Sequence, residues 1–80
     1  MGKQRVKFSF SAEMIKEPVI YQIGHTFDVV TNIRMADVDE QIGWVVLEIN
    51  GEVDEIDRAL VWARERGVRV DPIAGDVVEG

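Results

Sequence analysis

Few residues in this chain combine the types and the spacing that catalysis or metal binding requires. The sequence has one histidine, His25, and no cysteine, which excludes disulfides, thiol catalysis and cysteine-bound zinc or iron–sulfur sites within these 80 residues. The acidic run of Asp37, Asp39 and Glu40 is the nearest approach to a metal loop, but it does not have both the glycine and the closing glutamate of an EF-hand at the right spacing. We interpret His25 as a surface residue near a helix end, and the acidic run as a solvated turn.

Nucleophilic and phosphate-binding motifs are also missing from the sequence. Ser9 and Ser11 have no local base partner, and no GxSxG, GxxxxGK[ST] or GxGxxG pattern occurs. General acid–base catalysis needs titratable groups that converge in a pocket, and the sequence contains no such constellation. We therefore predict that the chain is not an enzyme and that it holds no cofactor of its own.

Two residues are better suited to binding than to catalysis. Asn32 interrupts the apolar arm VVTNIRM, and its amide both donates and accepts hydrogen bonds. It either holds a ligand or a neighbouring backbone, or it faces water on an edge strand. Trp44 is either an exposed interface or ligand-stacking residue, or a ring that lies over its own sheet.

The segment from Val29 to Gly51, which contains both residues, has the pattern of a β-hairpin. Strand-forming residues fill two arms, an acidic turn joins them, and an Asn-Gly pair ends the second arm. Side chains alternate along that arm, so Leu47 lies on one face while Trp44 and Val46 lie on the other. Gly43 begins the arm and marks either a bulge or a close backbone contact.

The rest of the chain supplies two helices and two more strands. Alternation predicts strands over 5–10 and 68–72, and helical periodicity predicts helices over 18–27 and 53–66. Right-handed crossovers then place both helices on one face of an antiparallel sheet of four strands in the order 4-1-3-2. We predict an α+β fold, a ferredoxin-like βαββαβ two-layer sandwich. One domain spans 1–80, with its core over about 5–73 and a tail or linker stub over 74–80.

Charge and length limit the partners of this chain. Nine basic and fifteen acidic residues give a net charge of −6, which argues against nucleic acid and anionic lipid as partners. Lys3, Arg5 and Lys7 share one face of the first strand, as a local basic patch or simply as a solvated face. No apolar run is long enough to cross a bilayer and no signal sequence is evident, so we expect a cytoplasmic protein.

Several short motifs together resemble the NIL domain family, over roughly residues 5–73. They are Val30–Arg34 with Ile42-Gly43, the strand VVLEI followed by Gly51, the helix entry Glu17-Pro18-Val19-Ile20, and Ala59-Leu60 with Arg66-Gly67-Val68. The family is named for an Asn-Ile-Leu triplet in its second strand. Here the triplet reads Asn32-Ile33-Arg34, so its third position departs from the family pattern.

The resemblance implies a regulatory domain in one of two contexts. In methionine-import ATPases the domain is C-terminal, dimerises and senses methionine. In a second branch it precedes a [4Fe–4S] ferredoxin module in proteins linked to sulfur amino-acid metabolism. Arg34 and the tail over 71–80 are more similar to the second branch. This predicts that the chain is the N-terminal part of a longer protein whose cluster-binding cysteines follow Gly80.

The resemblance also implies site residues and partners. We expect a non-catalytic, homodimeric module that binds methionine or a related amino acid. The expected ligand-binding residues are Asn32, Ile33 and Gly43, and the expected interface residues are Trp44, Val46 and Arg34. The alternative is a docking module that positions a downstream [4Fe–4S] electron-transfer module without binding a ligand. Arg34 brings charge close to Asn32, so a ligand other than methionine stays open.

Overall fold

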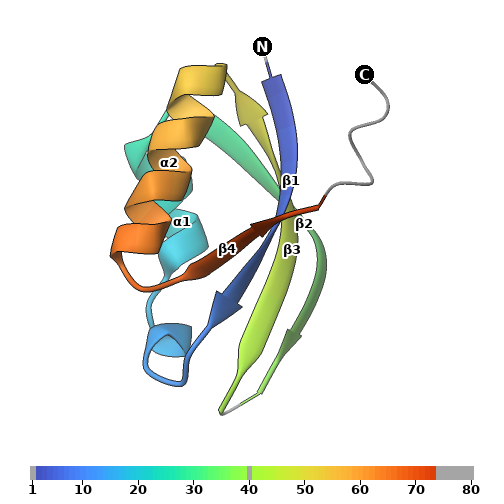
Figure 1. Ribbon diagram of the computed structural model, residues 1–80, viewed down its shortest axis with the longest axis vertical. Coiled ribbons are helices and arrows are strands. Elements are labelled where there is room, and N and C mark those ends of the chain that lie inside the picture. Colours follow the sequence, from blue (N-terminus) through green and yellow to red (C-terminus); the bar gives the residue numbers. More distant parts are fainter. Residues whose placement is uncertain (1, 40, 74–80) are drawn as a thin grey trace.

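The computed structural model describes residues 2–39 and 41–73. The elements are β1 (Gly2–Phe10), the short 3-10 helix η1 (Met14–Lys16), α1 (Val19–Thr26), β2 (Val29–Val38), β3 (Gly43–Gly51), α2 (Val53–Glu65) and β4 (Arg69–Pro72). The four strands form one sheet in the order β2-β3-β1-β4, and every neighbouring pair is antiparallel. Both helices cover the same face of this sheet (Figure 1). The predicted ferredoxin-like sandwich and its strand order are confirmed.

Alternation along the two central strands builds the core. Val6 pairs with Leu47 and Phe8 pairs with Val45, and all four side chains are buried on the face that the helices cover. The ring of Phe8 meets that of Phe10 edge to face, with centroids 6.1 Å apart. We call the opposite face of the sheet, which no described helix covers, the open face. It carries the other half of each strand's residues.

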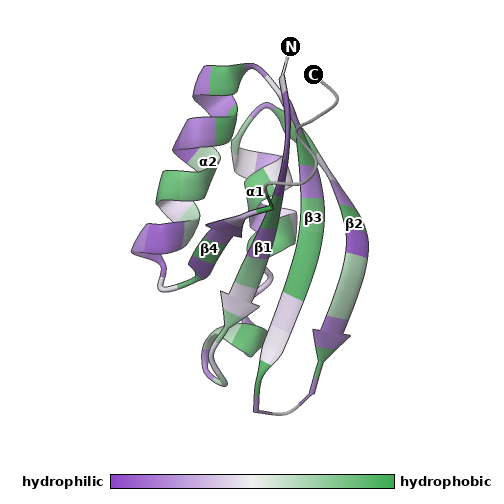
Figure 2. Ribbon diagram, turned by 45° about the vertical axis from the view of Figure 1, so that its right-hand side comes forward, coloured by the Kyte–Doolittle hydropathy of each residue, from purple (hydrophilic) through white to green (hydrophobic). Residues whose placement is uncertain are grey.

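The helices contribute apolar stripes to the same core. Val19 and Ile23 are the buried residues of α1, while Ile56, Ala59, Leu60 and Ala63 are those of α2. Hydrophilic and hydrophobic residues alternate in bands along α2 (Figure 2), as expected for a helix that covers a sheet on one side. No helix in the described part of the chain is both long and apolar enough to span a membrane.

Strand β2 lies at the edge of the sheet and carries an irregularity that the sequence did not predict. Ile33 pairs with Leu47 and Met35 pairs with Val46, so Arg34 is an extra residue in a β-bulge. The bulge reverses the alternation: Ile33 faces the helix side with Leu47, whereas Met35 faces the open side with Val46. A bulge at Gly43 was one alternative from the sequence, and it is wrong because Gly43 pairs regularly.

The predicted acidic turn is shorter in the structure than in the sequence pattern. Asp37 belongs to β2, where it pairs with Trp44. Asp39 makes the turn: its Oδ1 accepts hydrogen bonds from the backbone N–H groups of Gln41 at 2.8 Å and Ile42 at 2.9 Å. These two bonds hold the pKa of Asp39 below its usual value, first through Ile42 and then through Gln41. Glu40 and residues 74–80 lie outside the described residues.

Candidate functional site

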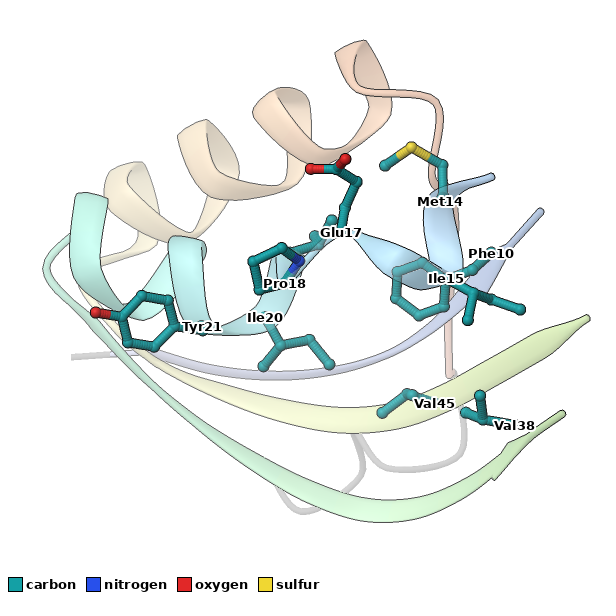
Figure 3. A pocket seen from close by; sticks show the side chains of 10 residues that line it. Phe10, Met14, Ile15, Glu17, Pro18, Ile20, Tyr21, Val38 and Val45 are labelled. Atoms are coloured by element: carbon teal, nitrogen blue, oxygen red, sulfur yellow. The ribbon is translucent and has the colours of Figure 1, made fainter. Parts of the chain in front are cut away.

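An apolar cavity of about 210 Å³ lies between the start of α1 and the turn end of the β2–β3 hairpin, where Val38 pairs with Gly43. Figure 3 shows its side chains approaching from several separate segments. They are Phe10 at the end of β1, Met14 and Ile15 in η1, the run Glu17–Tyr21 at the entry of α1, Val38 at the end of β2, and Val45 in β3. Nearly all of these side chains are apolar, so the cavity suits a hydrophobic group.

The connection between β1 and α1 forms one wall of this cavity. The backbone N–H of Ile15 donates to the carbonyl of Ser11 at 3.0 Å, and the N–H of Met14 donates to the Ser11 hydroxyl at 3.4 Å. These bonds turn the chain so that Met14 and Ile15 are partly buried against the core. Pro18 then acts as the N-cap of α1 without a side-chain capping bond.

Glu17 brings a carboxylate to the lining of the cavity. In Figure 3 its carboxylate lies on the side of Met14, away from Val38 and Val45. The Glu17 residue is exposed to solvent. The cavity therefore combines an apolar floor with one acidic group at its rim, where a polar part of a ligand would remain in water.

Gly43 is not itself a lining residue of the cavity, but it lies against the side chains of two residues that are. A Cβ placed on Gly43 would lie 3.2 and 3.3 Å from the two methyl groups of Val38 and 3.5 Å from Cδ1 of Ile15. Val38 and Ile15 both line the cavity. The missing side chain of Gly43 thus lets the end of β2 pack closely on the start of β3, which shapes the rim.

The other two predicted ligand-binding residues lie apart from the cavity. Asn32 is exposed and pairs with Glu48, which places it on the open face. Ile33 faces the helix side but stays 58% exposed, because β2 is the edge strand of the sheet. A single chain therefore does not bring Asn32 to the cavity, and the ligand-binding role of Asn32 stays a prediction.

The predicted interface residues gather on the open face. Trp44 and Val46 are both half-buried and lie two residues apart on β3. Nζ of Lys7, on the neighbouring strand β1, lies over the Trp44 ring at 5.1 Å from its centroid, so one face of the ring is in contact with a cation. Arg34 is the extra residue of the bulge, between the pairs Ile33–Leu47 and Met35–Val46. Their role as an interface stays a prediction.

The open face also holds an ion pair. Nη2 of Arg5 donates to Oε2 of Glu48 at 3.1 Å. This hydrogen bond is the main reason that the pKa of Glu48 lies below its usual value; burial opposes it, and the charges of Lys3 and Arg34 support it. Glu48 is therefore ionised at neutral pH.

Most of the residues that line the cavity carry no recognisable ligand-binding motif in the sequence. Ile15, Tyr21 and Val38 gave no motif, and they converge only in the folded chain. The one available signal was the apolar pair Met14-Ile15 within an otherwise polar connection. No group of three or more histidine, aspartate or glutamate residues in the described ranges could hold a metal ion.

The matching family model settles the relationship. The model described as NIL domain matches residues 4–72 of this chain. The chain belongs to the NIL domain family. The match includes both the cavity lining and the edge strand β2.

Relatives of this NIL domain are parts of larger proteins. It is 27% identical over 70 residues to the "Methionine import ATP-binding protein MetN" of Mannheimia succiniciproducens. This match covers 82% of this chain and 20% of that protein. It is 31% identical over 71 residues to the protein of the same name from Helicobacter hepaticus, covering 84% and 20%. The chain thus spans about a fifth of the length of these relatives.

A solved structure supports the fold independently. The C-terminal domain of an ABC transporter ATP-binding protein from Enterococcus faecalis superimposes with a TM-score of 0.78, covering 91% of this NIL domain and 86% of the other chain. The sequence identity of 22% makes this a likeness of fold alone.

Proposed function

We propose that this NIL domain is a non-catalytic regulatory module that binds methionine or a related amino acid with an apolar side chain. Two relatives carry the name of methionine-import ATP-binding proteins, and the domain matches about a fifth of each of them. A separate domain of this size, without a catalytic constellation in its sequence, is suited to sense a ligand for a larger protein.

The observation that carries the proposal is the apolar cavity beside Gly43. Its volume of about 210 Å³ is smaller than the ~300–1,000 Å³ of sites for drug-sized ligands. It is larger than the ~150 Å³ apolar cavity that holds benzene in another protein. It therefore suits a single apolar side chain. A thioether is unbranched and polarisable, and it makes favourable contacts with aromatic rings such as that of Phe10.

Pairing through β2 is the second part of the proposal. The ten-residue edge strand β2 pairs on one side with β3 and leaves its other side without a described partner strand. Val30, Ile33, Met35 and Val38 are all more than half exposed along it. Long apolar edge strands are templates for strand addition, so a second copy pairing along β2 would extend the sheet across the free backbone edge of this strand.

Titration with L-methionine tests the ligand proposal. Amide chemical shifts of the ¹⁵N-labelled domain should change around the cavity, at Ile15, Gly43 and Val45, and should saturate at millimolar ligand. Val38→Trp should weaken binding by about tenfold or more, because the indole would occupy the cavity. Val38 is 53% exposed, so the larger ring does not need space in the core.

A matched substitution on the same strand controls for this change. Val30 is similarly exposed, at 64%, but it pairs with Asn50 and lies on the open face. Val30→Trp should leave methionine binding within about twofold of the unmodified domain. Shift changes confined to Asn32 and its neighbours would instead place the ligand on the open face. Absence of any change at millimolar methionine would overturn ligand binding.

Mass in solution tests the pairing. We expect a dimer at micromolar concentrations and a monomer for Ile33→Lys, since a charge would be placed on the edge that the second copy covers. Val61→Lys, on the exposed side of α2, should leave the dimer intact. A monomer for the unmodified chain at all concentrations contradicts this part of the proposal.

The second candidate function is a docking module beside a [4Fe–4S] ferredoxin module. Arg34 in place of the family leucine and the half-buried pair Trp44 and Val46 favour it. Of the tail over 71–80 that resembles the lead-in to the cluster, residues 74–80 lie outside the described residues. The sequence of the parent gene tests this context: a cysteine-rich segment after Gly80 supports it, and the absence of one removes it.

A further inference from the structure

Charge is unevenly distributed between the two faces of this acidic domain. Five basic residues lie on the open face or at its edge, namely Lys3, Arg5 and Lys7 on β1, Arg69 on β4 and Arg34 at the bulge of β2. Three acidic residues accompany them, namely Glu48, Asp71 and Asp37. The rest of the chain therefore holds four of the nine basic residues but twelve of the fifteen acidic residues. Among the residues that the structure describes, the open face thus carries five basic against three acidic side chains, in a chain whose net charge is −6.

Ion pairs within the open face engage only some of its basic side chains. Glu48 accepts a hydrogen bond from Arg5, and Asp71 accepts one from Nε of Arg69 at 3.1 Å. Lys7 lies over the Trp44 ring rather than beside a carboxylate. In the described ranges, Lys3, Lys7 and Arg34 make no salt bridge, so their charges remain available to a partner.

An apolar centre lies between these cations. Trp44 and Val46 lie on β3, and Met35 on β2 pairs with Val46 on the same face, while Val30 lies further along that face, opposite Asn50. Val30 and Met35 are 64% and 60% exposed. Protein interfaces commonly combine an apolar centre that contains an aromatic residue with a polar rim, and tryptophan and arginine contribute most often to binding energy.

We propose that the open face is a docking surface for an acidic protein segment that carries apolar side chains. Its carboxylates would pair with Lys3, Lys7 and Arg34, and its apolar side chains would cover Trp44 and Val46. This inference extends the predicted interface role of these residues and does not depend on the cavity. Charge complementarity of this kind mainly increases the association rate and selects against wrong partners.

Nucleic acid fits this face less well than an acidic protein. A run of phosphates would meet Glu48, Asp71 and Asp37 between the cations, and it would approach a chain of net negative charge. A protein segment can place its carboxylates at the rim and apolar groups at the centre. The arrangement therefore favours spaced acidic groups over a continuous polyanion.

A random copolymer of glutamate and tyrosine is a probe with the required chemistry. We expect it to shift amide signals of β1 and β3 on the open face, and to bind more tightly than either polyglutamate or a single-stranded oligothymidylate. The double variant Lys3→Glu/Lys7→Glu should bind the copolymer about tenfold or more weakly, because each reversal replaces attraction by repulsion. Trp44→Ala should also weaken binding through the lost apolar contact.

A second double variant separates local charge from net charge. Lys16→Glu/Arg64→Glu changes the net charge by the same amount, but both residues are exposed outside the open face. It should retain copolymer binding within about threefold. Equal weakening by both double variants would overturn the proposal, as would no amide shifts with the copolymer or tighter binding of the oligothymidylate.

Folding and ligand binding provide two further readouts. Lys3→Glu/Lys7→Glu should unfold in urea at a midpoint close to that of the unmodified chain, since both lysines lie outside the core. The methionine titration of Lys3→Glu/Lys7→Glu should match that of the unmodified chain. Loss of copolymer binding with intact methionine binding therefore concerns the open face alone, and the reverse result concerns the cavity alone.

Discussion

Asn32 and Glu48 are direct cross-strand partners on the face of the sheet that the helices do not cover. Arg5, from the strand on the other side of β3, donates to the Glu48 carboxylate at 3.1 Å. The asparagine that names this family is therefore part of a polar row that crosses three strands. The apolar cavity lies on the other face of the same sheet, so the two features can be tested separately.

Glu48 should make stability depend on pH in the acidic range. Its hydrogen bond with Arg5 holds the pKa in the folded state below the usual 4.5. A lowered folded pKa means that the stabilisation is fully present above 4.5 and is lost as the pH falls through the folded value. Urea unfolding at a series of pH values should show a smaller acidic loss of stability for Glu48→Gln than for the unmodified chain.

Asp39 also contributes to the loss of stability in acid, because its pKa in the folded state is lowered too. Glu48→Gln should therefore keep a residual acidic slope, and adding Asp39→Asn should reduce that slope further. Identical slopes for the unmodified chain and Glu48→Gln would mean that the ion pair with Arg5 contributes nothing to stability.

Adjacent residues on β3 should respond very differently to truncation. Leu47 is fully buried on the helix side, so Leu47→Ala should lower the free energy of unfolding by about 2–5 kcal/mol through lost burial and the resulting cavity. Val46 is half-buried on the open face, and Val46→Ala should cost about 1 kcal/mol or less. Urea unfolding measures both. Similar losses would contradict the assignment of the two faces.

Two glycines should show opposite effects when changed to alanine. Gly24 lies in α1 with nothing within 4 Å of an added Cβ, so Gly24→Ala should stabilise the domain by about 0.5–1 kcal/mol through higher helix propensity. Gly67 also has open space around it, but its φ is +100°. Gly67→Ala should therefore destabilise the domain by about 1 kcal/mol or more.

The reason for this difference lies at the end of α2. The N–H of Gly67 donates to the carbonyl of Arg64 at 3.0 Å, and the N–H of Val68 donates to that of Ala63 at 3.1 Å. These bonds form a Schellman cap, which requires a left-handed residue at position 67. Equal unfolding midpoints for the two alanine variants would show that the backbone angle at Gly67 carries no cost.

Glu55 should stabilise the contact between α2 and the start of β2. Its Oε2 accepts a hydrogen bond from the N–H of Asp28 at 2.9 Å, and its Oε1 pairs with Arg58 at 2.8 Å. Glu55→Ala should cost about 1 kcal/mol and speed hydrogen exchange at the Asp28 amide. Arg58→Ala removes only the exposed ion pair and should cost about 0.5 kcal/mol or less. Unchanged exchange at Asp28 in Glu55→Ala would contradict the predicted role.

Local patterns determined the fold of this chain. Strict alternation around Val6 and Phe8, and again around Leu47, defines two-faced strands because successive side chains in a strand point to opposite sides. The apolar stripes of the helices and the glycine at position 67 mark helix faces and an end for equally local reasons. Strand order then followed from the handedness of the crossovers.

Only the tertiary structure decided the bulge at Arg34, which turns Met35 to the open face. The sequence of β2 does not determine this, because the register of the strand depends on its pairing with β3. It also decided the cavity, since Phe10, Ile15 and Val38 meet only when separate segments pack. The sequence by itself placed Asn32 and Gly43 in one hairpin. Only the folded sheet shows that they lie on different faces, because the pairing partner of each residue determines the face of the sheet on which it lies.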